Sequence, residues 1–117
     1  MESMWVVSQY AGDFNPFHIH EGQLSGVFYL RVPPSLPQEY AKEDHYPTVG
    51  DICWFDGRAS TFSGHKFQHS PTVGDIFLFP NWLAHGVYPF RTPNEERRSV
   101  SFNLHLIKKE EEKQLLK

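Results

Sequence analysis

The sequence predicts an all-β domain, a sandwich or a barrel with little helix, and three observations lead to this fold class. Aromatic residues make up 15% of the 117 residues, and bulky rings favour the half-buried surface of a sheet. Nine prolines and eight glycines favour many turns and few long helices. Short apolar runs alternate with turn sequences along the chain, as they do in proteins built from many short strands.

Three strands are predicted in the N-terminal part. Residues 5–10 (WVVSQY) are apolar and aromatic and stop at the turn sequence Ala-Gly-Asp, and residues 17–19 form a short extended segment. Residues 24–32 (LSGVFYLRV) are rich in aromatic and β-branched residues and are followed by two prolines, which end a strand. Residues 33–47 are polar and are predicted to be a surface excursion.

The C-terminal part contains four further segments that are predicted to be extended. Residues 52–55 and 76–79 are short apolar strands. Each begins at the last residue of a copy of the sequence PTVGDI, whose Gly-Asp pair indicates a turn. Residues 56–70 are rich in Gly, Ser and His and are predicted to be a loop, and residues 85–90 are a short extended segment. Residues 99–107 (SVSFNLHLI) alternate polar and apolar side chains, as a half-buried strand does.

Length and charge limit the classes of protein. The chain is long enough for one domain, placed at residues 1–107, and residues 108–117 form a charged tail. The net charge is −3 without a basic block, so nucleic acid is not an expected partner. No apolar run has membrane-spanning length, and the single Cys53 excludes an internal disulfide. The sequence shows no secretory signal, and a soluble cytoplasmic protein is expected. A homodimer is also expected to be possible, because the domain is rich in aromatic residues and has few helices to cover them.

Three of the seven histidines are candidate metal ligands. His18 and His20 form a His-x-His pair, and residues i and i+2 of a strand point to the same face, so that one ion can bridge both rings. His85 follows the apolar sequence FPNWLA and is the candidate third ligand. The alternative is that His18 and His20 are surface side chains at a strand edge. The remaining histidines are expected on the surface or, for the last of them, at the far end of the same cavity: His45, His65, His69 and His105.

The ligand type restricts the metal. Three neutral imidazoles on one face leave three open positions on an octahedral ion. Such a site suits Fe(II) with a bidentate co-substrate and oxygen, or a cupin-type iron, nickel or manganese site. A structural zinc site normally has a fourth protein ligand, and the sequence has no cysteine pair to supply one.

Four sequence stretches together carry a family resemblance: YAGDFNPFHIH, LSGVFYL, GDIFLFPNWLAHGVYP and RRSVSFN. They resemble the double-stranded β-helix core of the 2-oxoglutarate/Fe(II) oxygenases, and more narrowly a subfamily of bacterial and phage proteins. The resemblance extends from about Trp5 to Leu106. It implies a jelly-roll or cupin-like barrel, Fe(II) as the metal, 2-oxoglutarate as co-substrate, and a hydroxylase that acts on a small molecule or a peptide.

The prolyl-hydroxylase branch of that family implies the metal ligands. His18 follows Gly12 by six residues and matches the first iron ligand, and His85 matches the distal histidine. His20 stands where this branch has a carboxylate. Either three histidines bind the metal here, or a nearby acid replaces one of them, for which Asp13 and Glu21 are the local candidates.

The same branch implies the residues that bind 2-oxoglutarate. Tyr29 matches a tyrosine that contacts the co-substrate, and the basic residue for its far carboxylate corresponds to Arg97 or Arg98. Strand parity favours Arg97, because it shares a face with Ser99 and the polar residues that follow, whereas Arg98 shares the apolar face. The alternative for Arg97 is an ion pair with a neighbouring glutamate.

Two alternative functions remain open at this point. One is a cupin-type metalloenzyme that does not use 2-oxoglutarate, although the usual cupin glutamate after His-x-His is absent. The other is a metal- or ligand-binding β-barrel without catalysis, which the missing carboxylate supports. In the oxygenase interpretation, Trp54, Phe79 and Trp82 are expected to exclude water from the pocket.

Overall fold

The computed structural model describes residues 3–20, 22–42, 48–56 and 66–106. These residues form eight strands and one short helix. The elements are β1 (Ser3–Gln9), β2 (Asn15–His18), β3 (Leu24–Arg31), α1 (Leu36–Ala41), β4 (Ile52–Phe55), β5 (Lys66–His69), β6 (Ile76–Pro80), β7 (Ala84–Val87) and β8 (Arg97–Leu104).

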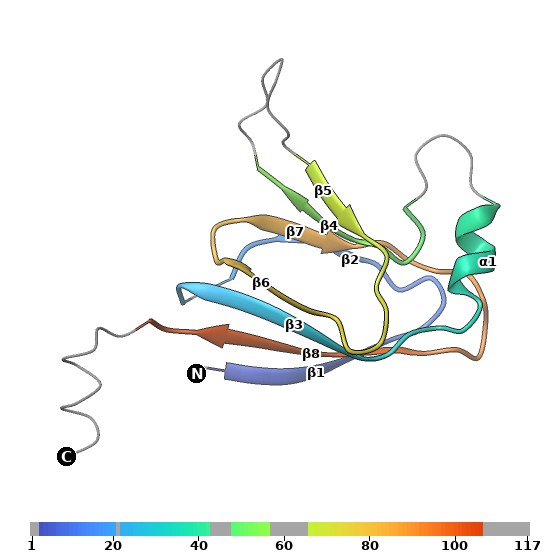
Figure 1. Cartoon of the computed structure of the whole chain (residues 1–117), viewed down its shortest axis with the longest axis horizontal. Helices are drawn as coiled ribbons and strands as arrows, with labels where there is room; N and C mark the ends of the chain where they lie inside the picture. Colours follow the sequence, from blue (N-terminus) through green and yellow to red (C-terminus); the bar gives the residue numbers. More distant parts are fainter. Residues whose placement is uncertain (1–2, 21, 43–47, 57–65, 107–117) are drawn as a thin grey trace.

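The strands form two four-stranded antiparallel sheets that face each other (Figure 1). The first sheet has the order β1-β8-β3-β6 and the second has the order β2-β7-β4-β5. The all-β prediction is therefore confirmed. The barrel prediction needs correction, because no pairing between described strands joins the two sheets, and each sheet keeps two free edges.

Two elements lie where the sequence predicted none. Strand β5 falls in the predicted loop, because KFQH lacks an apolar alternation and becomes a strand only by pairing with β4. Helix α1 falls in the predicted surface excursion. Its first residue, Leu36, is buried against Val49 and Phe90, so an apolar contact anchors this segment. The helix has six residues, and no helix among the described residues is long and apolar enough to cross a membrane.

Strand β8 has the two faces that its alternating sequence predicts. Arg97, Ser99 and Asn103 are buried between the two sheets. On the outer face, Phe102 lies in a cross-strand row that also contains Gly26 and Leu78, and Leu78 is 58% exposed. Strand β8 therefore turns its polar side chains inward and its apolar ones outward, which is the reverse of the usual arrangement.

An apolar cluster packs between the sheets beside the enclosed polar residues. It combines residues from β3, β4, β6 and β7, and these are Val27, Tyr29, Ile52, Trp54, Phe79 and Val87. This packing holds β7 of one sheet and β3 of the other at a fixed separation. The functional side chains described below project from these strands and from their neighbours β1, β2 and β8.

Both copies of the PTVGDI sequence form the predicted turn before a strand. The Asp51 N–H donates to the Thr48 carbonyl oxygen at 2.9 Å, and the Asp75 N–H donates to the Thr72 carbonyl oxygen at 3.1 Å. The glycine before each aspartate has a positive φ, 70° for Gly50 and 93° in the second copy, which L residues with a side chain rarely adopt. The two turns differ in what surrounds this glycine.

We expect Gly50→Ala to destabilise the protein more than Gly74→Ala. Both substitutions place a Cβ at a positive φ, which costs about 1–2 kcal/mol. A Cβ at Gly50 also lies 2.5 Å from Cδ1 of the buried Leu36, whereas at Gly74 it meets no atom within 4 Å. Overpacking of this kind adds roughly 1–3 kcal/mol. Urea denaturation of the two variants measures the difference, and equal losses of unfolding free energy would refute the Leu36 contact.

Candidate metal centre

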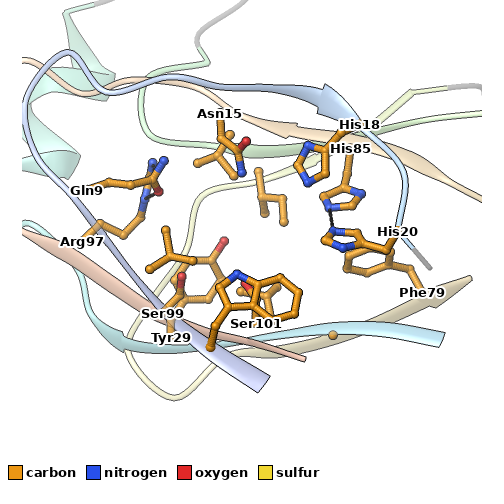
Figure 2. Close-up of a pocket in the computed structure, with 16 residues that line it drawn as sticks. Gln9, Asn15, His18, His20, Tyr29, Phe79, His85, Arg97, Ser99 and Ser101 are labelled. Atoms are coloured by element: carbon orange, nitrogen blue, oxygen red, sulfur yellow. Dashed lines mark hydrogen bonds between the residues drawn. The ribbon is translucent and has the colours of Figure 1, made fainter. Parts of the chain in front are cut away.

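Three histidines gather at one end of the space between the sheets (Figure 2). The antiparallel pairing of β2 with β7 places His18 directly opposite His85. His20 lies two residues beyond the end of β2, so the predicted i, i+2 strand geometry does not hold there. Instead, Asn81 holds His20: the His20 N–H donates to the Asn81 carbonyl oxygen at 3.1 Å, and the Asn81 side chain donates to the His20 carbonyl oxygen at 3.2 Å.

Backbone carbonyls orient two of the three rings, those of His18 and His85. Nδ1 of His18 donates to the Pro16 carbonyl oxygen at 2.6 Å, and Nδ1 of His85 donates to the Leu83 carbonyl oxygen at 3.2 Å. In each ring this leaves Nε2 with a lone pair. A ligating histidine in a metal site typically donates its second ring nitrogen in the same way.

The spacing of the rings fits a single metal ion. Nε2 of His20 lies 2.9 Å from Nε2 of His85, and two nitrogen ligands about 2.1 Å from one ion at right angles are about 3.0 Å apart. The ligand atoms of all three histidines lie within 4.8 Å of one another. Because Nε2 of His85 is an acceptor, Nε2 of His20 carries the proton between them. A metal bound by Nε2 of His20 would require this proton to be on Nδ1 instead.

Burial keeps two rings of the cluster, His20 and His85, neutral. Desolvation lowers the pKa of His85 to about 4. The hydrogen bond to the Leu83 carbonyl opposes this shift, and the neighbouring His18 and His20 each add a smaller lowering effect. Desolvation, followed by the charge of His18, also lowers the pKa of His20. At pH 7 both imidazoles are neutral, which is the form that binds a metal.

No carboxylate joins the three histidines among the residues that the structure describes. One predicted acid, Asp13, is exposed, and its carboxylate accepts the Tyr10 N–H at 2.9 Å and so closes a turn. The other, Glu21, lies outside the described residues. The described part of the site is thus an uncharged ligand set that leaves the full charge of a bound ion for an anionic ligand to balance.

The other histidines lie away from this cluster or outside the described residues. His69 is exposed, and its Nε2 lies 2.9 Å from the carboxylate of Asp75. His105 is exposed beyond the end of β8 and does not line the cavity. His45 and His65 lie outside the described part of the chain, as does the predicted tail at residues 108–117.

A cavity of about 70 Å³ extends from the histidines between the two sheets. Arg97 lies at its opposite end (Figure 2) and is 1% exposed. Its guanidinium donates to Oε1 of Gln9 at 2.8 and 3.0 Å and to the Gly50 carbonyl oxygen at 2.7 Å, and it has two longer contacts of 3.5 Å with the Tyr88 carbonyl oxygen. All of these acceptors are uncharged.

The charge of Arg97 is therefore not neutralised by an ion pair within the described structure. Desolvation lowers the pKa of this guanidinium to about 10, and the more distant Tyr29, Asp13 and Asp51 oppose the shift. The predicted alternative, a pair with a neighbouring glutamate, is made by Arg98 instead, whose Nη2 lies 2.9 Å from Glu96. A buried, unpaired cation at a cavity wall favours an anionic ligand.

Two hydroxyl side chains lie beside Arg97. Tyr29 and Ser99 are Cα partners in the pairing of β3 with β8, and both are buried and line the cavity. Burial raises the pKa of the Tyr29 phenol well above its ordinary value, against the opposite effect of Arg97. At neutral pH the phenol keeps its proton and can donate a hydrogen bond to a ligand.

Sequence reasoning missed several side chains that line the cavity, among them Trp5, Gln9 and Asn15. Their roles depend on how β1 and β2 pair, and no local pattern reveals a pairing across almost the whole chain. Of the aromatic residues expected to exclude water, Phe79 lines the cavity, and the centroid of its ring lies 4.6 Å from that of the His85 ring. Trp54 lies in the apolar cluster and not in the cavity wall, and Trp82 is 57% exposed.

A comparison with protein families tests the resemblance directly. The model of the family described as "Putative 2OG-Fe(II) oxygenase" matches residues 3–103. The chain belongs to this family. A comparison with curated proteins found no match. The matched residues include the three histidines at one end of the cavity and Arg97 at the other. Fe(II) and 2-oxoglutarate, which the family description names, are therefore the ligands to consider for this site.

Proposed function

We propose that this domain is a 2-oxoglutarate-dependent Fe(II) dioxygenase that hydroxylates a small molecule or a peptide. One observation carries the proposal: a buried guanidinium, Arg97, which forms no ion pair with any described residue, faces a cluster of three histidines across one cavity. A dicarboxylate that is a 2-oxo acid at one end supplies a negative charge to each end of the cavity: one carboxylate for the metal and one for Arg97. In this interpretation His18, His20 and His85 hold the metal, and Arg97, Tyr29 and Ser99 bind the far carboxylate.

The residues of the chain orient and shield the reactants. When bound, Fe(II) supplies the activation of O₂ that is coupled to the conversion of 2-oxoglutarate to succinate. The carbonyls of Pro16 and Leu83 keep two imidazoles turned toward the metal position. Phe79 covers the His85 ring and limits the access of water. The hydroxyl of Tyr29 donates to the far carboxylate, which fixes the co-substrate along the cavity.

The strand pairing supports the finer fold assignment that goes with this function. Each strand of the first half pairs with its counterpart counted from the other end: β1 with β8, β2 with β7, β3 with β6, and β4 with β5. One long hairpin that is wound so that its turns fall alternately in two sheets produces this order. We assign the fold on this basis to the double-stranded β-helix, in an open form.

Anaerobic addition of 2-oxoglutarate to the Fe(II)-loaded protein tests the proposal. Chelation of the metal by the 2-oxo acid is expected to give a weak charge-transfer band in the visible range. A cupin-type metalloenzyme that does not use 2-oxoglutarate would bind Fe(II) without this band. A domain that binds metal or another ligand but has no catalytic activity is the second candidate, and the absence of a carboxylate beside the three histidines in the described residues favours it.

A further inference from the structure

We propose that Gln9 forms the anion subsite together with Arg97: its amide oxygen positions the guanidinium, and its amide nitrogen donates to the carboxylate that Arg97 attracts. This inference rests on the proposed function, because it takes 2-oxoglutarate as the ligand of the cavity. The family resemblance supplied no role for Gln9, and its place in the site follows from the pairing of the first strand with the last.

The position of Gln9 is fixed by the first sheet. It is the last residue of β1 and the Cα partner of Arg97 in β8, and it is 8% exposed. Its Oε1 accepts hydrogen bonds from both Nε and Nη2 of Arg97, at 3.0 and 2.8 Å. One amide oxygen thus occupies the side of the guanidinium that would otherwise receive the two oxygens of a carboxylate.

The orientation of the Gln9 amide follows from chemistry. A guanidinium has only donors, so the amide must turn its oxygen to Arg97 and its NH₂ group away from it. No acceptor for this NH₂ group occurs among the described residues, and Gln9 lines the cavity (Figure 2). Gln9 therefore offers unused donors to a ligand at the position where the charge of Arg97 acts.

A ligand needs these donors because Arg97 has little hydrogen-bonding capacity left. Its Nη1 donates to the Gly50 carbonyl oxygen at 2.7 Å, and the contacts of Nη1 and Nη2 with the Tyr88 carbonyl oxygen are long, 3.5 Å each. Only the weakly engaged N–H groups near Tyr88 remain for a direct bond. Arg97 supplies the charge of the subsite, and Gln9 with Tyr29 supplies donors.

The neutrality of Gln9 matters as much as its donors. A glutamate has nearly the same shape and would make the same two contacts with Arg97. It would also neutralise the guanidinium and present acceptors in place of donors to the incoming carboxylate. Two substitutions of similar size separate the donors of Gln9 from its neutrality. Gln9→Met removes the donors and stays neutral, whereas Gln9→Glu removes the donors and adds a negative charge.

The experiment is a calorimetric titration of 2-oxoglutarate into anaerobic Fe(II)-loaded protein, with metal affinity and thermal unfolding measured for each variant. We expect Gln9→Met to weaken 2-oxoglutarate binding about tenfold, as the loss of a hydrogen bond to a charged group does. Gln9→Glu is expected to weaken it more than about a hundredfold, because the cation is neutralised. Metal affinity should stay unchanged. Gln38→Glu, on the exposed side of α1, adds the same charge away from the site and should bind like the parent.

The outcomes separate this inference from the proposed function. Unchanged or tighter binding by Gln9→Met would mean that the amide only fills a space or competes for the guanidinium, and it would overturn the donor role. Equal binding by Gln9→Glu and the parent would overturn the charge argument. If Arg97→Ala weakens binding while both Gln9 variants do not, only this inference fails. If the parent protein does not bind 2-oxoglutarate, the proposed function fails and this inference with it.

Discussion

Replacement of Arg97 by alanine is expected to weaken 2-oxoglutarate binding by about 10- to 150-fold. A charge-assisted hydrogen bond in a partly dry site contributes roughly 1.5–3 kcal/mol, which corresponds to that range. Arg97 is the single charged side chain in the wall of the cavity as described, so no neighbour replaces its charge. Metal affinity should change little, because the three histidines lie at the other end of the cavity.

A titration of 2-oxoglutarate into metal-loaded protein measures this effect, and two variants control it. Arg97→Lys keeps the charge but loses the planar fork of donors, so an intermediate loss of affinity is expected. Arg98→Ala removes the neighbouring arginine, whose side chain binds Glu96 outside the cavity, and should bind like the parent. If Arg98→Ala causes the larger loss, the faces of β8 are exchanged relative to this structure and the anion subsite is wrong.

We expect the substitutions His18→Ala, His20→Ala and His85→Ala each to lower metal affinity at least about tenfold. Loss of a direct ligand costs more than the 10- to 100-fold that loss of its supporting hydrogen bond typically costs. The effect should be largest for His85, because it is the most buried of the three and its Nε2 lies 2.9 Å from that of His20. Competition with a metal-sensitive dye measures the affinities.

His69→Ala is the matched control, because this histidine is exposed and bound to Asp75, and its metal affinity should equal that of the parent. The decisive variant is His20→Ala. If it binds metal as tightly as the parent, the site is not a three-histidine centre. A carboxylate outside the described residues, such as Glu21, would then complete it.

The two ends of the site were predictable from the sequence for different reasons. The strict alternation of SVSFNLHLI fixes the parity of β8, so that Arg97 and Ser99 could be assigned to the inner face without knowing what lies opposite. His18 was likewise expected beside His85. For His20 the expected position was right and the reason was wrong: β2 ends at His18, and hydrogen bonds to Asn81 hold His20 in place.

The features that the sequence could not predict depend on long-range pairing. Gln9 is an ordinary polar residue at the end of a strand until β1 pairs with β8, which brings it beside Arg97. Strand β5 similarly exists only through β4. The burial of Leu36 in a polar segment depends on Val49 and Phe90. In each case the stabilising partner lies more than ten residues away, where a local pattern carries no information.

The central claim is that one ligand bridges the histidine cluster and Arg97. A crystal structure of the protein grown anaerobically with Fe(II) and 2-oxoglutarate tests it most directly. The predicted result is an ion bound by Nε2 of His18, His20 and His85 and chelated by the 2-oxo acid, with the far carboxylate beside Arg97 and the amide nitrogen of Gln9. An ion with a different ligand set, or a co-substrate whose far carboxylate does not reach Arg97, would contradict the claim.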